Sequence, residues 1–348
     1  MHYRLFGQHT GLRVSELVLG TANFGTRWGY GANLDAARDI VDRYAYAGGN
    51  FLDCADVYQF GESEEFLGEL LSARRNEFVI ATKYTQAAAP NAGVLATGNS
   101  RLAMRLSVEA SLKRLKTDRI DLYWVHFSDG ITPMDEIMRG LDDLVRSGKV
   151  LYVGLSDFPA WRAARASTIA ELRGWARIAG LQFEHSLVER TSEHELMPAG
   201  NALGLGMVAW SPLGGGLLSG KYRQGETGRL EALGGAVFQQ ENTGQRTAIV
   251  DAVLAVAAEV GVSPSAVAVA WVLHKGSLPI IGPRTSKQLT AYLDASELTL
   301  APHHVELLNS VSALSPIFPH TMIDTTASRE AAAGGQYKRV VTPERSVG

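Results

Sequence analysis

The chain has 348 residues, of which 46% are hydrophobic and 20% charged, a composition that supports a large buried core and excludes a disordered protein. Lys and Arg number 33 against 36 Asp and Glu, so the net charge is −3, and no basic block indicates binding to nucleic acid or to a membrane surface. We therefore expect a small-molecule partner.

The chain begins with a predicted hairpin. Apolar and polar residues alternate on both sides of a turn at residues 7–11, with Tyr3 and Leu5 before it and Leu12 and Val14 after it. We expect this hairpin to cap the base of the fold that follows.

Short apolar runs alternate with longer amphipathic stretches from about residue 17 to about residue 295. This alternation is typical of repeated strand–helix units and predicts a parallel sheet. The predicted strands are 17–20, 50–53, 78–83, 120–126, 150–156, 178–183, 206–210 and 278–282. Helices are predicted between them at 35–47, 62–71, 101–115, 134–147 and 160–173. Because eight parallel strands can close on themselves, we predict a (β/α)8 TIM barrel.

The chain is longer than the ~250 residues of a plain eightfold barrel, so we expect insertions. The candidates are residues 86–100, residues 224–245 and the tail after Pro316. We place extended loops and this tail at the barrel mouth, and we expect mobility in residues 316–348 because chain ends are often poorly ordered. No linker divides the sequence, so residues 1–348 are predicted to form a single domain.

A doubly wound open sheet is the competing fold. It normally carries G-x-G-x-x-G directly after its first strand. Here the first strand is followed by GTANFGTRWGYG, whose glycines do not have that spacing. The sequence therefore favours the barrel.

Four chemically suitable residues follow successive predicted strands. Asp53 ends the second strand and Tyr58 lies in the loop after it, while Lys83 and His126 end the third and fourth strands. The carboxyl ends of barrel strands converge on one mouth, so we expect these side chains to meet. Each residue type is common at such positions for purely structural reasons, and only the combination is specific.

The combination is that of a tuned proton donor. A tyrosine hydroxyl with a pKa of about 10 is a poor acid at neutral pH, and a nearby cation favours its anion. Lys83 can supply that charge, Asp53 can hold Lys83 in place, and His126 can hydrogen-bond the oxygen that receives the proton. We predict that Tyr58 protonates a carbonyl oxygen while the carbonyl carbon accepts a hydride.

The motifs that carry these residues resemble those of the aldo-keto reductase superfamily along nearly the whole chain. They are, in order, GTANFG, DCADVY, ATK, DLYWVH, GKVLYVGLSDF, LQFEHSLVER, VAWSPLGGGLLSGKY and GPRTSKQL. The resemblance implies a (β/α)8 barrel that binds NADPH, with NADH possible, and lacks a Rossmann motif. It also implies that Tyr58 is the acid and that Asp53, Lys83 and His126 support it.

Cofactor contacts are expected at the strand ends and in the loop after the seventh strand. The candidates are Gly20, Thr21, Asp53, Ser156, Asp157, Gln182, Trp210, Ser211, Leu213, Gly215, Lys221, Gly282, Arg284 and Gln288. Trp210 can stack on a nicotinamide ring, and the glycine-rich loop lets backbone amides approach a pyrophosphate. Arg284 suits the 2′-phosphate that distinguishes NADPH from NADH. Asp157 and Tyr292 stand where many relatives carry asparagine.

A substrate pocket is expected above the predicted acid. Its candidate residues are Phe24, Trp28, Tyr58, Tyr84, His126 and Phe127. An apolar wall of this kind suits aromatic or aliphatic aldehydes and ketones. Phe318, His320 and Met322 of the tail are expected to complete the pocket.

The remaining features indicate the cellular compartment and the class of reaction. Cys54 is the only cysteine, so no internal disulfide forms, and the absence of a long apolar run indicates a cytoplasmic protein. No metal is expected, since the histidines are scattered and His303 and His304 lie beyond the barrel repeats, which argues against a metal-dependent barrel hydrolase or lyase. The main hypothesis is a reversible NADPH-dependent carbonyl reductase. The alternative is a cofactor-sensing regulatory subunit similar to potassium-channel β subunits, and the substrate, the reaction direction and the oligomeric state stay open.

Overall fold

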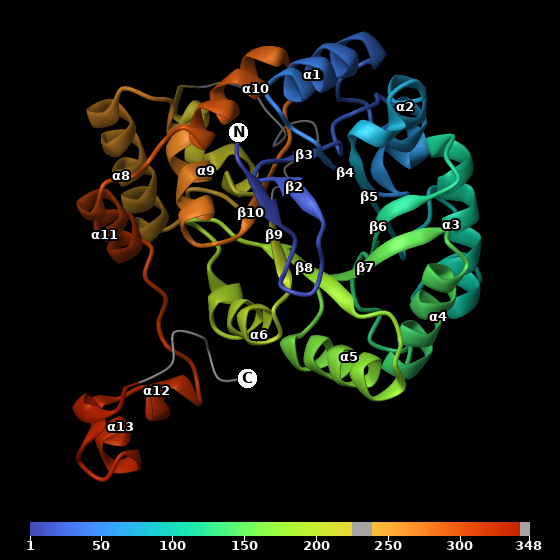
Figure 1. Ribbon diagram of the computed structural model, residues 1–348. Helices are drawn as coiled ribbons and strands as arrows, with labels where there is room; N and C mark the ends of the chain where they lie inside the picture. Colours follow the sequence, from blue (N-terminus) through green and yellow to red (C-terminus); the bar gives the residue numbers. More distant parts are fainter. Residues whose placement is uncertain (225–238, 342–348) are drawn as a thin grey trace.

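Parallel strands form a closed barrel at the centre of the molecule (Figure 1). The computed structural model describes residues 1–224 and 239–341. The barrel strands, in chain order, are β3 (Val18–Gly20), β4 (Phe51–Asp53), β5 (Val79–Tyr84), β6 (Ile120–Val125), β7 (Val150–Ser156), β8 (Ile178–Glu184), β9 (Gly206–Trp210) and β10 (Leu278–Ile281). Neighbours in sequence are neighbours in space, and β10 pairs with β3 to close the ring. The predicted TIM barrel is confirmed.

Helices surround the barrel on its outer side (Figure 1). They are α1 (Leu34–Tyr46), α2 (Glu62–Leu70), α3 (Arg101–Leu115), α4 (Met134–Arg146), α5 (Ala160–Arg173), α6 (Leu196–Ala202), α8 (Gly244–Val260), α9 (Pro264–His274) and α10 (Ser286–Leu293). Side-chain caps begin several of them. Asn33 accepts a hydrogen bond from the backbone N–H of Ala36, and Ser100 accepts one from Ala103.

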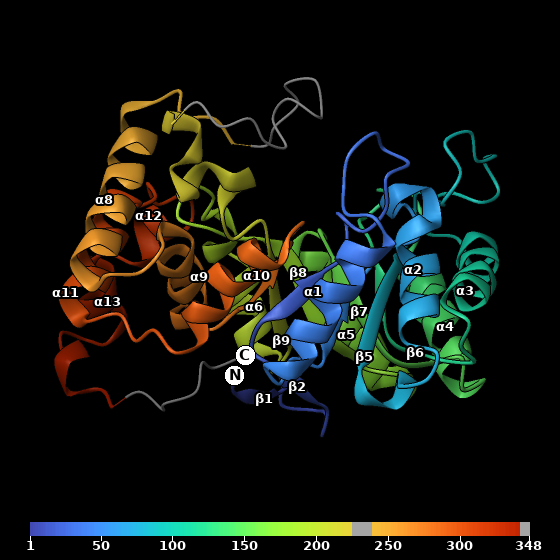
Figure 2. The same ribbon diagram turned by 90° about the horizontal axis from the view of Figure 1, so that it is seen from above.

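The predicted hairpin is confirmed at the start of the chain. Strand β1 (Tyr3–Leu5) pairs antiparallel with β2 (Arg13–Ser15). The Phe6 ring is fully buried and lies edge-on against Phe51 and Trp124, with ring centres 5.7 and 6.3 Å apart. Figure 2 shows the hairpin on the side of the barrel opposite the loops that follow the strands. The hairpin therefore closes the base and leaves the mouth for a site.

The barrel interior is packed with side chains. Leu122 and Trp124 of β6 point inward and belong to the inner cluster, whereas Tyr123 and Val125 pack outward against the helices. A Cβ at Gly154 on the neighbouring strand would lie 2.3 Å from the Trp124 ring. Only glycine leaves room there for the indole, so the lower barrel is a solid core and any site must lie above it.

The tail does not reach the mouth in the described structure. After α11 (Pro302–Val311), which packs on α8, the helices α12 (His320–Ile323) and α13 (Thr326–Ala332) lie outside the ring of barrel helices (Figure 1). His320 Nε2 lies 3.0 Å from Glu195 Oε1, in the segment before α6. Residues 316–341 of the tail therefore do not lie at the mouth, contrary to the prediction. Residues 225–238 of the second predicted insertion, and residues 342–348, lie outside the described part of the chain.

In the two described ranges, no single helix combines the length and apolarity needed to cross a membrane. Helices α8 and α9 would do so together by length and composition only, and a bend of 102° separates them.

Candidate active site

A cavity of about 580 Å³ opens at the carboxyl ends of the barrel strands. Its lining includes residues at or just after strand ends, namely Gly20, Asp53, His126, Asp157, Gln182, Trp210 and Gly282. A parallel barrel brings these positions to one mouth, whatever their separation in sequence. The volume is that of a site for a cofactor or another small organic molecule.

Lys83 connects the catalytic candidates at one wall of this cavity. Its Nζ donates hydrogen bonds to Asp53 Oδ2 at 2.5 Å, to the Tyr58 hydroxyl at 2.9 Å and to the Cys54 carbonyl oxygen at 2.9 Å. Lys83 and Asp53 are buried, whereas Tyr58 is partly exposed and lines the cavity. Because Lys83 donates to the Tyr58 oxygen, the phenolic hydrogen is left for an acceptor in the cavity.

Burial keeps the Tyr58 hydroxyl protonated. Burial raises the pKa of the Tyr58 hydroxyl, and the Lys83 charge opposes this rise without cancelling it. For Lys83, burial lowers the pKa, but attraction to Asp53 and the hydrogen bonds to Asp53 and Tyr58 outweigh it, so the pKa is raised. The site therefore contains a neutral phenol bonded to a permanent ammonium ion. The sequence predicts that the Lys83 charge lowers the pKa of Tyr58, whereas in the structure the effect of burial is larger.

His126 lies beside Tyr58 as a neutral imidazole. Their ring centres are 6.0 Å apart with nearly perpendicular planes, and His126 lines the cavity. Burial, assisted by the charge of Lys83, lowers the pKa of His126 to about 3. Its Nδ1 is buried without a hydrogen-bond partner among the described residues. His126 can therefore act near neutral pH as a hydrogen-bonding group without adding a charge.

A turn that the sequence analysis missed positions the residues above Tyr58. Tyr58 begins a 3₁₀ turn, Tyr58–Gly61, in which Gln59 has a φ of 52° and lies in the left-handed region. This conformation buries the Gln59 amide, whose Oε1 accepts from the Trp28 backbone N–H at 2.8 Å and whose Nε2 donates to the Tyr30 carbonyl oxygen at 3.1 Å. The bonds hold the Trp28 ring edge-on to Tyr58, with ring centres 6.3 Å apart.

The cavity floor is a chain of hydrogen bonds. Gln182 Nε2 donates to Asp53 Oδ1 at 2.8 Å, which satisfies the second oxygen of that carboxylate. Trp210 Nε1 donates to Asp157 Oδ1 at 3.0 Å, and the Ser156 hydroxyl donates to Asp157 Oδ2 at 3.2 Å. Burial raises the pKa of Asp157, and these two hydrogen bonds oppose the rise. The Asp157 backbone N–H donates to the Gln182 carbonyl oxygen at 2.9 Å, so the floor connects Asp53 to Trp210.

The loop after β9 supplies a glycine cradle. Gly214, Gly215 and Gly216 all have positive φ angles, of 55°, 65° and 97°. The Tyr222 hydroxyl donates to the Gly215 carbonyl oxygen at 2.9 Å, and a Cβ at Gly216 would lie 3.0 Å from Lys221 Cε. Gly215, Gly216 and Lys221 line the cavity, so backbone and a lysine border the space next to Trp210.

The far end of the cavity is formed after β10. The Arg284 backbone N–H donates to Gln288 Oε1 at 2.8 Å, and its guanidinium lies 5.7 Å from the centre of the Tyr30 ring. Asn23 Nδ2 donates to the Gly282 carbonyl oxygen at 2.8 Å, which ties this end to the loop after β3. Arg284, Gln288 and Tyr292 all line the cavity.

Several predicted residues lie elsewhere. Phe24 and Tyr84 are completely buried in the outer core, where Tyr84 stacks on Tyr123 with ring centres 5.3 Å apart. Phe127 flanks His126, with ring centres 5.9 Å apart, and is outside the cavity lining. The remaining candidates outside the lining are Thr21, Lys83, Ser156, Phe318, His320 and Met322, and Lys83 lies buried behind Asp53 and Tyr58.

The lining also contains residues that the sequence analysis did not select. They are Ala22, Asn23, Tyr30, Val57, Gln86, Pro212, Gly216, Ile280 and Ile281. In the sequence, only their position in segments next to strand ends could have indicated that they line the cavity. Residue type did not separate Tyr30, which borders the cavity, from Phe24, which packs in the core.

Comparisons with known proteins agree with this geometry. Residues 16–313 match the model of the Aldo/keto reductase family. The chain is 39% identical to the uncharacterized oxidoreductase YrpG of Bacillus subtilis, covering 89% of this chain and 96% of that protein. It is 34% identical to norsolorinic acid reductase stcV of Emericella nidulans (91% and 83% covered) and 32% identical to aryl-alcohol dehydrogenase [NADP(+)] of Phanerodontia chrysosporium (92% and 88% covered).

Proposed function

The chain belongs to the aldo/keto reductase family and is an oxidoreductase that acts on carbonyl or alcohol groups, and on this premise we propose that it reduces aldehydes and ketones with NADPH, using Tyr58 as the proton donor. One observation carries the proposal. Lys83 Nζ bonds both Asp53 and the Tyr58 hydroxyl at the wall of a cavity of about 580 Å³.

The proposed proton transfer uses groups that are already in place. When bound, the reduced nicotinamide supplies a hydride to the carbonyl carbon. Tyr58 donates its hydroxyl proton to the carbonyl oxygen, and the Lys83 ammonium, 2.9 Å away, stabilises the phenolate that is left. Asp53 fixes Lys83, and the neutral His126 orients the carbonyl oxygen by a hydrogen bond.

The residues along the cavity fit a dinucleotide. Trp210 presents an aromatic face beside the floor, the glycine cradle provides backbone amides and Lys221 provides charge, and Arg284 stands at the far end. A guanidinium is suited to bind the 2′-phosphate of NADPH. The name of the Phanerodontia chrysosporium relative includes NADP(+), which supports the same cofactor here.

The proposed substrates are aldehydes and ketones with a flat apolar group. Trp28 borders the cavity beside Tyr58, and Tyr30 borders it toward Arg284. Aromatic partners prefer edge-on or offset contacts of the kind that Trp28 makes with Tyr58. The aryl-alcohol dehydrogenase among the relatives supports this class. The reverse reaction, oxidation of an alcohol, uses the same groups with Tyr58 as the base.

A panel of aromatic and aliphatic carbonyl compounds tests the proposal. Purified protein is mixed with each compound and with NADPH or NADH, and the loss of the reduced-nicotinamide absorbance is followed. We expect turnover of aromatic aldehydes, with a higher kcat/KM for NADPH than for NADH. Tight NADPH binding without turnover of any compound would contradict the proposal and favour the regulatory alternative.

A further inference from the structure

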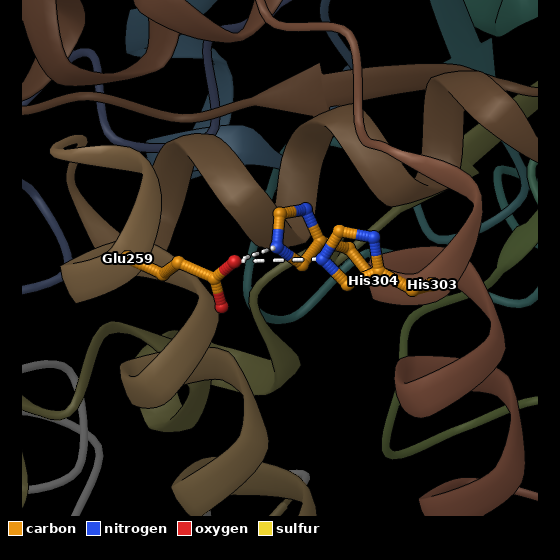
Figure 3. Close-up of side chains that lie close together, drawn as sticks. All are labelled: Glu259, His303 and His304. Atoms are coloured by element: carbon orange, nitrogen blue, oxygen red, sulfur yellow. Dashed lines mark hydrogen bonds and ion pairs between the residues drawn. The ribbon is translucent and has the colours of Figure 1, made fainter.

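Three potential metal ligands converge where α8 ends and α11 begins (Figure 3). Glu259 lies in the last turn of α8, and His303 and His304 directly follow the proline that starts α11. Glu259 Oε1 is 3.4 Å from His303 Nε2 and 3.1 Å from His304 Nε2. One ligand atom from each residue lies within 4.8 Å of the others.

The two imidazoles are oriented in an uncommon way. Consecutive residues of a helix point in directions about 100° apart, so their side chains do not normally face one partner. Here the ring centres of His303 and His304 are only 4.0 Å apart, and Figure 3 shows both rings turned toward the Glu259 carboxylate. They lie at the N-terminal end of α11, where the approach of α8 brings the acid to them.

His304 adds a second, independent observation. Its side chain is 7% exposed, and neither ring nitrogen makes a hydrogen bond to a described residue. Nε2 faces the Glu259 oxygen without the alignment of a hydrogen bond. A buried nitrogen without an aligned hydrogen bond is costly, and a metal ion between Nε2 and the carboxylate would satisfy both groups.

The spacing of the ligand atoms suits a shared ion. Zinc binds imidazole nitrogen and carboxylate oxygen at about 2.0–2.2 Å, so neighbouring ligand atoms of a tetrahedral site lie about 3.3–3.6 Å apart. The separations of 3.1 and 3.4 Å are close to this. Glu259 and His303 are exposed, so water can complete the coordination.

We propose that Glu259, His303 and His304 bind one Zn²⁺ ion that fastens α11 to α8. Two imidazoles and a carboxylate form a borderline ligand set that Zn²⁺ accepts. Because the ligands come from two helices far apart in sequence, the ion acts as a crosslink and stabilises the packing of α11.

This site is separate from the proposed catalytic cavity. None of the three ligands is among the residues that line the cavity. Zn²⁺ at this position supports the fold and leaves the reaction unchanged.

Calorimetric titration with Zn²⁺ of chelator-treated, full-length protein tests the proposal. We expect one equivalent to bind and the affinity to fall at least about tenfold in Glu259→Gln and in His303→Ala, because each removes a ligand. Both positions are exposed, so neither change should impair folding, which circular dichroism checks. His274→Ala, which removes an exposed histidine from a neighbouring helix, is the matched control and should bind as the unaltered protein does.

A thermal measurement gives a second readout. Excess Zn²⁺ should raise the Tm of the unaltered protein and of His274→Ala, and should leave that of Glu259→Gln unchanged. Failure of the unaltered protein to bind Zn²⁺ would overturn the proposal. So would equal binding by the ligand variants, or equal loss in the His274 control, since either result places the metal elsewhere.

Discussion

Lys83 Nζ lies 2.5 Å from Asp53 Oδ2, with 0% of the lysine side chain and 2% of the aspartate side chain exposed to solvent. A buried pair of this kind is held by its mutual attraction against the cost of removing both charges from water. The pairing leaves the ammonium group 2.9 Å from the Tyr58 hydroxyl, so the ion pair positions the charge that a phenolate would need.

The coupling between these two residues can be measured by unfolding. Asp53→Asn and Lys83→Met should each destabilise the protein by about 3–5 kcal/mol, because each leaves an uncompensated buried charge. The double variant should lose less than the sum of the two. Urea unfolding of the four proteins gives the values, and strictly additive losses would show that the pair is not coupled.

Asp56 should make the protein less stable as the pH rises. Its carboxylate is 1% exposed with no hydrogen-bond partner in the described residues, and burial, aided by the nearby charge of Glu64, raises its pKa to about 8. The unfolded chain releases this proton near pH 4 and the folded protein holds it to about pH 8, so stability contributed by the bound proton falls across that window.

Asp56→Asn removes this titration. The variant should gain stability over the unaltered protein as the pH rises from 5 to 8, as measured by the free energy of unfolding at each pH. Asp118→Asn is the matched control, since the side chain of Asp118 is 93% exposed. The same pH profile in the unaltered protein and in Asp56→Asn would contradict the prediction.

The barrel was predictable because each strand is a short apolar run between amphipathic stretches. Strands β7 and β9 begin and end at the predicted residues, and the other predicted strands overlap the observed ones. Once the strand ends were located, the meeting of Asp53, Lys83 and His126 followed from the geometry of a parallel barrel.

The upper wall of the site could not be predicted from the pattern of apolar runs. Phe24 and Tyr84 follow strands as His126 does, but they turn into the outer core. Gln59 and Phe60 adopt left-handed conformations although neither is a glycine or an asparagine, and the Gln59 amide determines where Trp28 lies. Loop conformation depends on such tertiary bonds, which no periodic pattern records.

Trp28 should contribute to substrate affinity more than to the chemical step. Trp28→Ala removes the ring that lies 6.3 Å from Tyr58 and should raise KM for an aromatic aldehyde several-fold more than for a small aliphatic one. Steady-state kinetics with both substrates measure this. Trp161→Ala, at a side chain 67% exposed on α5, is the control. Equal effects on both substrates would show that Trp28 does not contribute to substrate binding.

Arg284 should discriminate between NADPH and NADH. Arg284→Gln is expected to lower kcat/KM for NADPH about 10- to 100-fold, the range for losing a hydrogen bond to a charged group, and to leave NADH nearly unchanged. Lys287→Gln, at an exposed position in the first turn of α10 and outside the cavity lining, should change neither. A uniform loss for both cofactors would indicate a structural role for Arg284.

The role of Tyr58 is tested most directly by Tyr58→Phe, which removes only the hydroxyl and keeps the ring that packs against Trp28. The variant should bind NADPH as the unaltered protein does, by fluorescence titration, and reduce an aromatic aldehyde at least about 100-fold more slowly, the contribution of a general acid. Turnover at the unaltered rate with NADPH still bound would contradict the assignment of Tyr58 as the proton donor.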